Sequence, residues 1–182
     1  MNRRQILSAV GLSIFSLSGC LDNRDGDETG ENPDPDEGRS VSVTITHVAG
    51  DGAISFNYDV RRSVITEESL AVIELTARNK TESELEYGTG APKPFGALYD
   101  PESPEAILWT DKYTESEYVE TDGRQITGGE DIGLHVTLPP GDSRSEIYEF
   151  SAPPGNYSIQ RTSNPLTLGN DTYELEVVVS EA

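Results

Sequence analysis

The stretch VSVTITHVAGDGAISFNYDV, residues 41–60, decides the fold. Apolar and polar residues alternate in both of its halves, and the glycine-containing AGDG between them interrupts the pattern. Neighbouring side chains of a β-strand point to opposite faces, so a period of two predicts strands with one buried face. The stretch therefore predicts two strands separated by a turn.

The same pattern continues towards the C-terminus. Further strands are predicted at residues 70–79, 83–87, 95–99, 106–109, 134–138, 146–151, 157–160 and 173–179. The last of these carries Tyr173, Leu175, Val177 and Val179 on one face, which we expect to seal the core. Eight to ten short strands separated by Gly, Pro and Asn predict an all-β protein, an antiparallel immunoglobulin-like β-sandwich spanning residues 40–182.

Two near copies, LPPGDS (138–143) and APPGNY (152–157), flank one predicted strand. Proline restricts one backbone dihedral angle, and glycine permits angles that other residues avoid. We interpret both segments as hairpin corners and not as ligand motifs.

Three segments carry a family resemblance: ARNKTESELEYGTGAPKPFGALYD (77–100), LPPGDSRSEIYEF (138–150) and PPGNYSI (153–159). Together they resemble surface lipoproteins of halophilic archaea. More distantly, they are similar to the immunoglobulin-like domain of bacterial intracellular proteinase inhibitors. In both families an N-x-T follows a core strand, and a PG-(D/E)-S turn leads to a strand that ends in PG-x-Y. The resemblance implies the sandwich fold, while GTGAPKPFGALY (88–99) departs from the inhibitor pattern.

The first twenty residues, MNRRQILSAVGLSIFSLSGC, have the layout of an export signal. Arg3 and Arg4 precede an apolar run over 6–17, which is too short for a helix that spans a bilayer core of about 30 Å. The final LSGC resembles the lipobox of lipoproteins, in which the cysteine becomes the first mature residue and carries lipid. We predict a lipoprotein signal peptide over 1–19 and lipidation of Cys20. The paired arginines favour twin-arginine export, with the general secretory route as the alternative.

Charge and composition indicate the structure of the segment after the signal peptide and the salt conditions that suit the protein. Residues 20–39 are rich in acids, Gly and Pro, and we predict a disordered tether. The whole chain has 33 acids against 13 bases and a net charge of −20, which excludes nucleic acid as a partner because phosphate binding needs clustered bases. High salt screens such self-repulsion, so the composition is interpreted as halophilic.

The sequence contains no motif that predicts a catalytic, cofactor-binding or metal site. The chain has no Gly-x-Ser-x-Gly, no zinc-protease motif and no phosphate-binding loop. His47 and His135 have no second metal-ligating residue at the spacing of known metal sites. His47 is therefore interpreted as a residue at a strand edge whose hydrogen bonds are satisfied, and His135 as exposed. We expect no enzyme activity.

A few surface features are candidates for contacts or modification. Residues 110–131 form a long predicted loop with two aromatic rings, Tyr113 and Tyr118, which suits recognition. Sequons for glycosylation begin at the asparagines in NKT, NYS and NDT, which are Asn79, Asn156 and Asn170.

These observations lead to an expectation about location and role. We expect a lipid-anchored protein on the extracellular face of the cell membrane, attached through Cys20. Its sandwich is expected to act as a binding or structural module that contacts a cell-surface protein or glycan. The alternatives are a proteinase-inhibitor-like domain and a solute-binding lipoprotein.

Overall fold

The computed structural model describes residues 38–130, 132–161 and 165–181, and these contain thirteen strands and one short helix. The strands are β1 (Arg39–Ala49), β2 (Ile54–Arg62), β3 (Val64–Ile65), β4 (Ala71–Asn79), β5 (Leu85–Thr89), β6 (Leu98–Tyr99), β7 (Val119–Asp122), β8 (Gln125–Gly129), β9 (Leu134–Leu138), β10 (Ser143–Phe150), β11 (Gly155–Arg161), β12 (Leu166–Leu168) and β13 (Asp171–Glu181). The helix is α1 (Lys112–Glu115).

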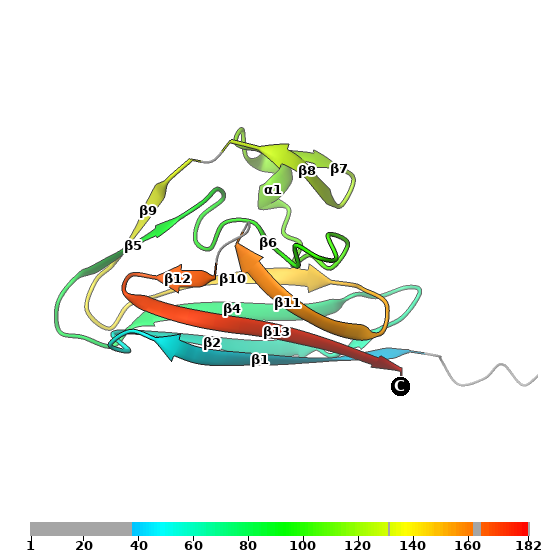
Figure 1. The fold of residues 1–182 in the computed structure, drawn as a ribbon, viewed down its shortest axis with the longest axis horizontal. Helices are drawn as coiled ribbons and strands as arrows, with labels where there is room; N and C mark the ends of the chain where they lie inside the picture. The colour runs from blue at the N-terminus through cyan, green and yellow to red at the C-terminus, as the bar shows by residue number, and fades with distance from the viewer. Residues whose placement is uncertain (1–37, 131, 162–164, 182) are drawn as a thin grey trace, which may run out of the picture. The chain divides into compact units, whose positions relative to one another are not determined.

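Two antiparallel sheets form the body of the molecule. One has the strand order β3-β1-β13-β11-β6, with β12 also paired to β13, and the other has the order β10-β4-β2. Figure 1 shows these strands stacked in the lower part of the view. The two-stranded β5–β9 ribbon rises from them towards α1 and the β7–β8 hairpin at the top. The predicted all-β sandwich is confirmed.

Alternation of side chains builds the core as the sequence predicts. On β13, Tyr173, Leu175, Val177 and Val179 are all buried, and the residues between them are more exposed. The same alternation runs along β4, whose inward residues are fully buried. Because the buried faces of the two sheets meet, one continuous hydrophobic cluster fills the sandwich.

The strand inventory differs from the prediction of eight to ten. The added strands β3 and β12 have only two and three residues, too few to show a period. Residues 106–109, predicted as a strand, form two isolated bridges instead, between Tyr99 and Ile107 and between Trp109 and Glu149.

The prediction of a long loop over residues 110–131 is wrong, because this segment contains α1 and the β7–β8 hairpin. Strand β7 ends at Asp122, and Gly123 follows with φ +58°, which a glycine adopts without steric cost. An Asp-Gly pair between short β-branched segments is a strong hairpin signal. The sequence therefore contains a hairpin signal, but the acidic residues around it make the segment resemble a loop.

The two Pro-Gly segments are turns, but they connect the sheets instead of closing hairpins. The first leads from β9, which pairs with β5, to β10, which pairs with β4. The second leads from β10 to β11, which pairs with β13 in the other sheet. Hydrogen bonds hold both: the Asp142 amide donates to the Pro139 carbonyl at 3.1 Å, and the Tyr157 hydroxyl donates to the Pro153 carbonyl at 2.7 Å. The hairpin interpretation is thus corrected to corners between sheets.

Candidate functional site

A pocket of about 570 Å³ opens beneath the β7–β8 hairpin, and we call it the hairpin pocket. Its lining comes from the hairpin, from the segment around β6 and from the end of β11. The lining includes Ala97, Tyr99, Pro101, Pro104, Ile107, Tyr118, Val119, residues 126–130, Ile132 and Arg161. This volume lies in the range of pockets that hold small ligands.

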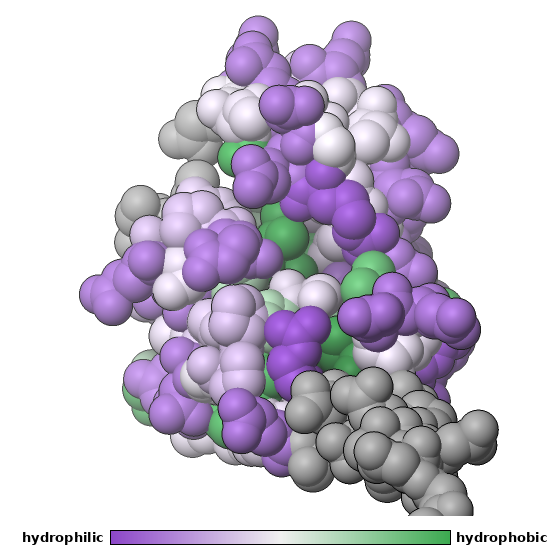
Figure 2. Space-filling view, turned by 90° about the vertical axis from the view of Figure 1, so that its right-hand side faces the viewer, coloured by the Kyte–Doolittle hydropathy of each residue, from purple (hydrophilic) through white to green (hydrophobic). Residues whose placement is uncertain are grey.

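The walls of the hairpin pocket combine apolar side chains with polar atoms in similar amounts. Tyr99, Val119 and Ile126 pack one side against the core and remain partly exposed. Figure 2, in which the β7–β8 hairpin lies at the top, shows hydrophobic surface in the middle of a mostly hydrophilic face. Burying such apolar surface against another molecule is favourable.

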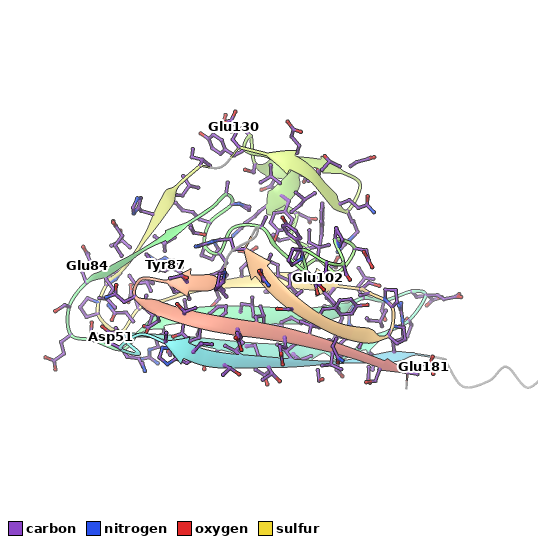
Figure 3. All side chains as sticks on the ribbon, in the orientation of Figure 1. Asp51, Glu84, Tyr87, Glu102, Glu130 and Glu181 are labelled. Atoms are coloured by element: carbon purple, nitrogen blue, oxygen red, sulfur yellow. The ribbon has the colours of Figure 1, made fainter. Side chains whose placement is uncertain are left out.

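Arg161 supplies the positive charge of the pocket. It ends β11, where it pairs with Leu98 of β6, and its Nη1 donates to the Gly88 carbonyl at 2.9 Å. Burial lowers the pKa of the Arg161 guanidinium, because a partly desolvated charge is less stable than a hydrated one. The acidic residue of the lining is Glu130, whose amide donates to the Tyr118 carbonyl at 3.0 Å. Figure 3 shows Glu130 beside the hairpin.

Buried contacts connect α1 to the sandwich and so position the hairpin that follows it. Tyr113 in α1 is completely buried. Its hydroxyl donates to the Leu108 carbonyl at 2.9 Å and accepts the Leu98 amide at 3.2 Å. Its ring packs edge-on against Trp109, with 5.4 Å between ring centroids. Burial raises the pKa of the Tyr113 hydroxyl, which keeps it protonated as a donor.

The hairpin itself is held by Arg124, which lies between its two strands. The guanidinium lies 5.3 Å from the centroid of the Trp109 ring and pairs with Glu149 at 2.7 Å. These contacts join the hairpin to β10 at the side of the pocket.

The two predicted contact aromatics have different positions. Tyr113 lies in the core and offers no ring to a partner, so that part of the prediction is corrected. The Tyr113 hydroxyl is buried and has two main-chain partners, so the side chain contributes to packing. The sequence around Tyr113 has no feature that distinguishes packing from recognition. Tyr118 is partly exposed and lines the hairpin pocket.

The three candidate glycosylation sites also differ. Asn79 is fully buried, and its amide nitrogen donates to the carbonyls of Ser83 and Leu138 at 2.7 and 2.9 Å. Its side-chain oxygen accepts the amide and the hydroxyl of Thr81, both at 2.8 Å. Asn79 therefore holds the corner after β4 and is not available to accept a glycan in the folded protein. An Asn at the end of a strand is typical of such a corner, because its side chain can form an Asx turn. Asn156 and Asn170 are exposed.

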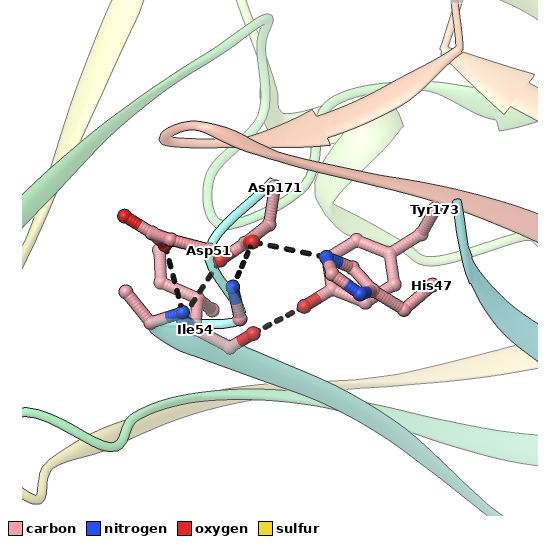
Figure 4. Close-up of polar contacts among 7 residues, drawn as sticks. His47, Asp51, Ile54, Asp171 and Tyr173 are labelled. Carbon is pink, nitrogen blue, oxygen red and sulfur yellow. Dashed lines mark hydrogen bonds and ion pairs between the residues drawn. The ribbon is translucent and has the colours of Figure 1, made fainter. Parts of the chain in front are cut away.

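A second polar cluster surrounds Asp171 at the turn between β1 and β2 (Figure 4). The buried carboxylate accepts the Gly52 amide at 2.6 Å, the Ile54 amide at 2.9 Å and His47 Nε2 at 3.0 Å. Burial alone would raise the pKa of Asp171, but these donors together lower it below its ordinary value. The Tyr173 hydroxyl donates to the Ile54 carbonyl beside it. This cluster holds the turn between β1 and β2.

Both histidines lie where the sequence places them. His47 is satisfied by Asp171 at the end of β1, and His135 is exposed, with Nδ1 3.0 Å from a carboxylate oxygen of Glu86. Within residues 38–130, 132–161 and 165–181, no three His, Cys, Asp or Glu side chains are grouped to hold a metal ion. None of the helices in this part of the chain has the length and hydrophobicity to cross a membrane. The predicted signal peptide, Arg3, Arg4, Cys20 and most of the tether lie outside the described residues.

Sequence reasoning missed Arg161 and the pocket around it. Arg161 follows an alternating strand in a chain with few bases, which singles it out only weakly. Its apolar neighbours in the lining lie 29 to 70 positions earlier in the chain, so no local pattern joins them.

Comparison with known proteins identifies the family of this chain. Searches found no significant match among curated proteins or among solved structures. The profile of a family described as Domain of unknown function (DUF8130) matches residues 1–160, which include the N-terminal segment, the hairpin pocket except Arg161 and most of the sandwich. The chain therefore belongs to the DUF8130 family.

Proposed function

We propose that this protein is a lipid-anchored protein of the extracellular membrane face that binds a small ligand in the hairpin pocket. The observation that carries the proposal is the pocket itself, with about 570 Å³ of space between mixed apolar and polar walls and, among the described residues, one arginine in its lining. The β7–β8 hairpin, Tyr99 of β6, Arg161 of β11 and the loops next to them supply the lining.

The chemistry of the lining favours binding over catalysis. Among its described residues there is no His, Cys or Ser, so the usual pairs of a nucleophile and a base are not assembled there. Among the described lining residues, Glu130 and Arg161 carry charges of opposite sign, which suits orientation of a bound molecule.

The location follows from the N-terminal sequence. The lipobox-like LSGC provides Cys20 for a lipid, and the acidic residues 20–39 would separate the sandwich from the membrane. The paired Arg3 and Arg4 favour twin-arginine export. The family match begins at residue 1, which is consistent with this segment being a shared part of the family.

The anchor is tested by Cys20→Ser. We expect the variant to be released from membranes, or to accumulate as an uncleaved precursor, when cell fractions are compared by immunoblot. Unchanged membrane retention together with normal cleavage would contradict the lipobox interpretation.

The pocket is tested with N-phenyl-1-naphthylamine, an uncharged apolar probe whose fluorescence rises on binding. The full chain carrying Cys20→Ser is titrated beside Ile126→Trp, which fills the pocket, and Val64→Trp, which adds the same ring to an exposed position on β3. We expect one saturable site that Ile126→Trp weakens at least tenfold and Val64→Trp leaves unchanged. Equal affinity in all three proteins would refute binding in the hairpin pocket.

The proteinase-inhibitor alternative receives no support from the packing of residues 88–99. An inhibitory loop must protrude, yet Phe95 and Leu98 in this segment are fully buried and Ala91 is nearly so. A macromolecular partner such as a surface protein or glycan would be detected by crosslinking on intact cells, and Tyr118 is the predicted contact ring that is still available to it.

A further inference from the structure

Arg161 gives the hairpin pocket a positive charge. The chain has 33 acids and 13 bases, and among the described Lys and Arg side chains only Arg61, Lys112 and Arg124 take part in ion pairs. Arg161 takes part in none of the ion pairs found among the described residues. It is also the one basic residue in the described lining of the pocket. Arg161 therefore offers a ligand a positive charge that no carboxylate of the described residues pairs with.

Within the described residues, most of the hydrogen-bond donors of the Arg161 guanidinium have no partner. One of its five N–H donors is used by the Gly88 carbonyl. Burial lowers the pKa of this group because its charge is partly desolvated. A carboxylate matches the planar guanidinium with two parallel hydrogen bonds, the strongest arrangement open to it.

Unused polar groups lie close to the same carbonyl. Tyr87 and Thr89 flank Gly88 on β5, both are buried, and neither hydroxyl has a hydrogen-bond partner among the described residues. Figure 3 shows Tyr87 on this ribbon. The charge of Arg161 reaches the Tyr87 hydroxyl and opposes the rise in its pKa that burial causes. Buried polar atoms without partners are rare, and these two adjoin the Gly88 carbonyl that holds Arg161, outside the lining of the pocket itself.

The apolar part of the pocket defines the rest of the ligand. Tyr99, Ile107 and Ile126 present ring and methyl surface next to Arg161. The volume of about 570 Å³ accommodates one or two rings with a short side chain.

We propose that the hairpin pocket binds a small organic anion, with its carboxylate on Arg161 and its apolar body against the β7–β8 hairpin. This inference rests on the proposed function, because it names the class of ligand for the same pocket. The net charge of −20 repels anions at low ionic strength, so selection of an anion has to come from the short-range contact with Arg161.

The test compares probes that differ in charge but share an apolar body. The full chain with Cys20→Ser is titrated in molar KCl with N-phenyl-1-naphthylamine and with its sulfonated relative 1-anilinonaphthalene-8-sulfonate. The variant Arg161→Gln is compared with Arg62→Gln, because Arg62 also ends a strand and also donates one hydrogen bond to a main-chain carbonyl, that of Leu70. We expect Arg161→Gln to lower the affinity ratio of the anionic over the neutral probe about tenfold or more, and Arg62→Gln to leave it unchanged.

A measurement on the unsubstituted pocket complements the variants. Indole-3-acetate and indole-3-acetamide have nearly the same shape and differ by the charge, and each is used to displace the neutral probe. We expect the acid to displace it at a concentration about tenfold lower than the amide. Binding of the neutral probe with no preference for either anion would overturn this inference and leave the proposed function standing. A neutral probe that does not bind would overturn both.

Discussion

Replacing Asp171 by asparagine tests what holds the turn between β1 and β2. The carboxylate is buried and accepts three hydrogen bonds, from Gly52, Ile54 and His47. Asparagine has the same shape but only one acceptor oxygen, so its amide nitrogen would face a backbone donor and leave it unpaired. We therefore expect Asp171→Asn to destabilise the protein although no cavity is formed.

The magnitude follows from the contacts that are lost. A buried donor without a partner costs about 1–3 kcal/mol, and the remaining bonds lose the added strength that an ionised acceptor gives them. The sum is about 3 kcal/mol of unfolding free energy. For a domain of this size we expect a fall in Tm of about 10 °C.

The pH dependence has a defined sign. The pKa of Asp171 is lower in the folded state than its ordinary value of 3.8, so the folded protein holds the proton less tightly than the unfolded chain. The stabilisation is complete above pH 3.8 and is lost as the pH falls through the folded-state pKa. The difference between the original protein and Asp171→Asn should be full at pH 7 and shrink below the ordinary pKa.

Urea unfolding followed by circular dichroism measures both effects. The matched control is Asp51→Asn in the same turn, because Asp51 is exposed and accepts only the Ala53 amide, at 3.0 Å. We expect a change below about 0.5 kcal/mol for this control. An Asp171→Asn protein within 0.5 kcal/mol of the original at pH 7, or a difference that grows in acid, would refute the reasoning.

Other positions give independent checks. Tyr113→Phe removes a buried hydroxyl with two main-chain partners and should cost about 1–2 kcal/mol in urea unfolding, whereas no change would show that its ring alone matters. Gly50→Ala places a methyl group against the backbone of the adjoining β12–β13 turn at φ +117° and should cost more than 3 kcal/mol. Gly123→Ala, at φ +58° in open space, should cost only about 1 kcal/mol, and equal losses for both glycines would contradict this account. Mass spectrometry of the exported protein should find Asn79 unmodified, in contrast to the exposed Asn156, and a glycan on Asn79 would mean that modification precedes folding.

The fold class was predictable because burial alternates locally along each strand. The inward residues of β13 could be named from the sequence, since a period of two is a property of neighbouring residues. Very short strands such as β3 and β12 were not predictable, because two or three residues cannot display a period. The β7–β8 hairpin was missed although Asp122 and Gly123 marked it, because the acidic composition of the segment resembles that of a loop.

The candidate site was less predictable than the fold. Tyr118 was singled out by its aromatic ring and does line the hairpin pocket, but Tyr113, chosen on the same ground, is in the core. An aromatic residue suits both places, and only packing distinguishes them. Asn79 likewise matches a sequon, yet its side chain is hydrogen-bonded to the backbone of the surrounding corner.

By itself, the sequence determined the alternating strands and their inward faces, and it carried the predictions about Cys20 and the tether. Tertiary structure alone decided which distant residues meet. Arg161 reaches Gly88, 73 positions away, and Asp171 reaches Ile54, 117 positions away. The reason is physical: a side chain's preference for one face depends on its neighbours in the chain, whereas strand pairing and the corners between sheets depend on packing of the whole core.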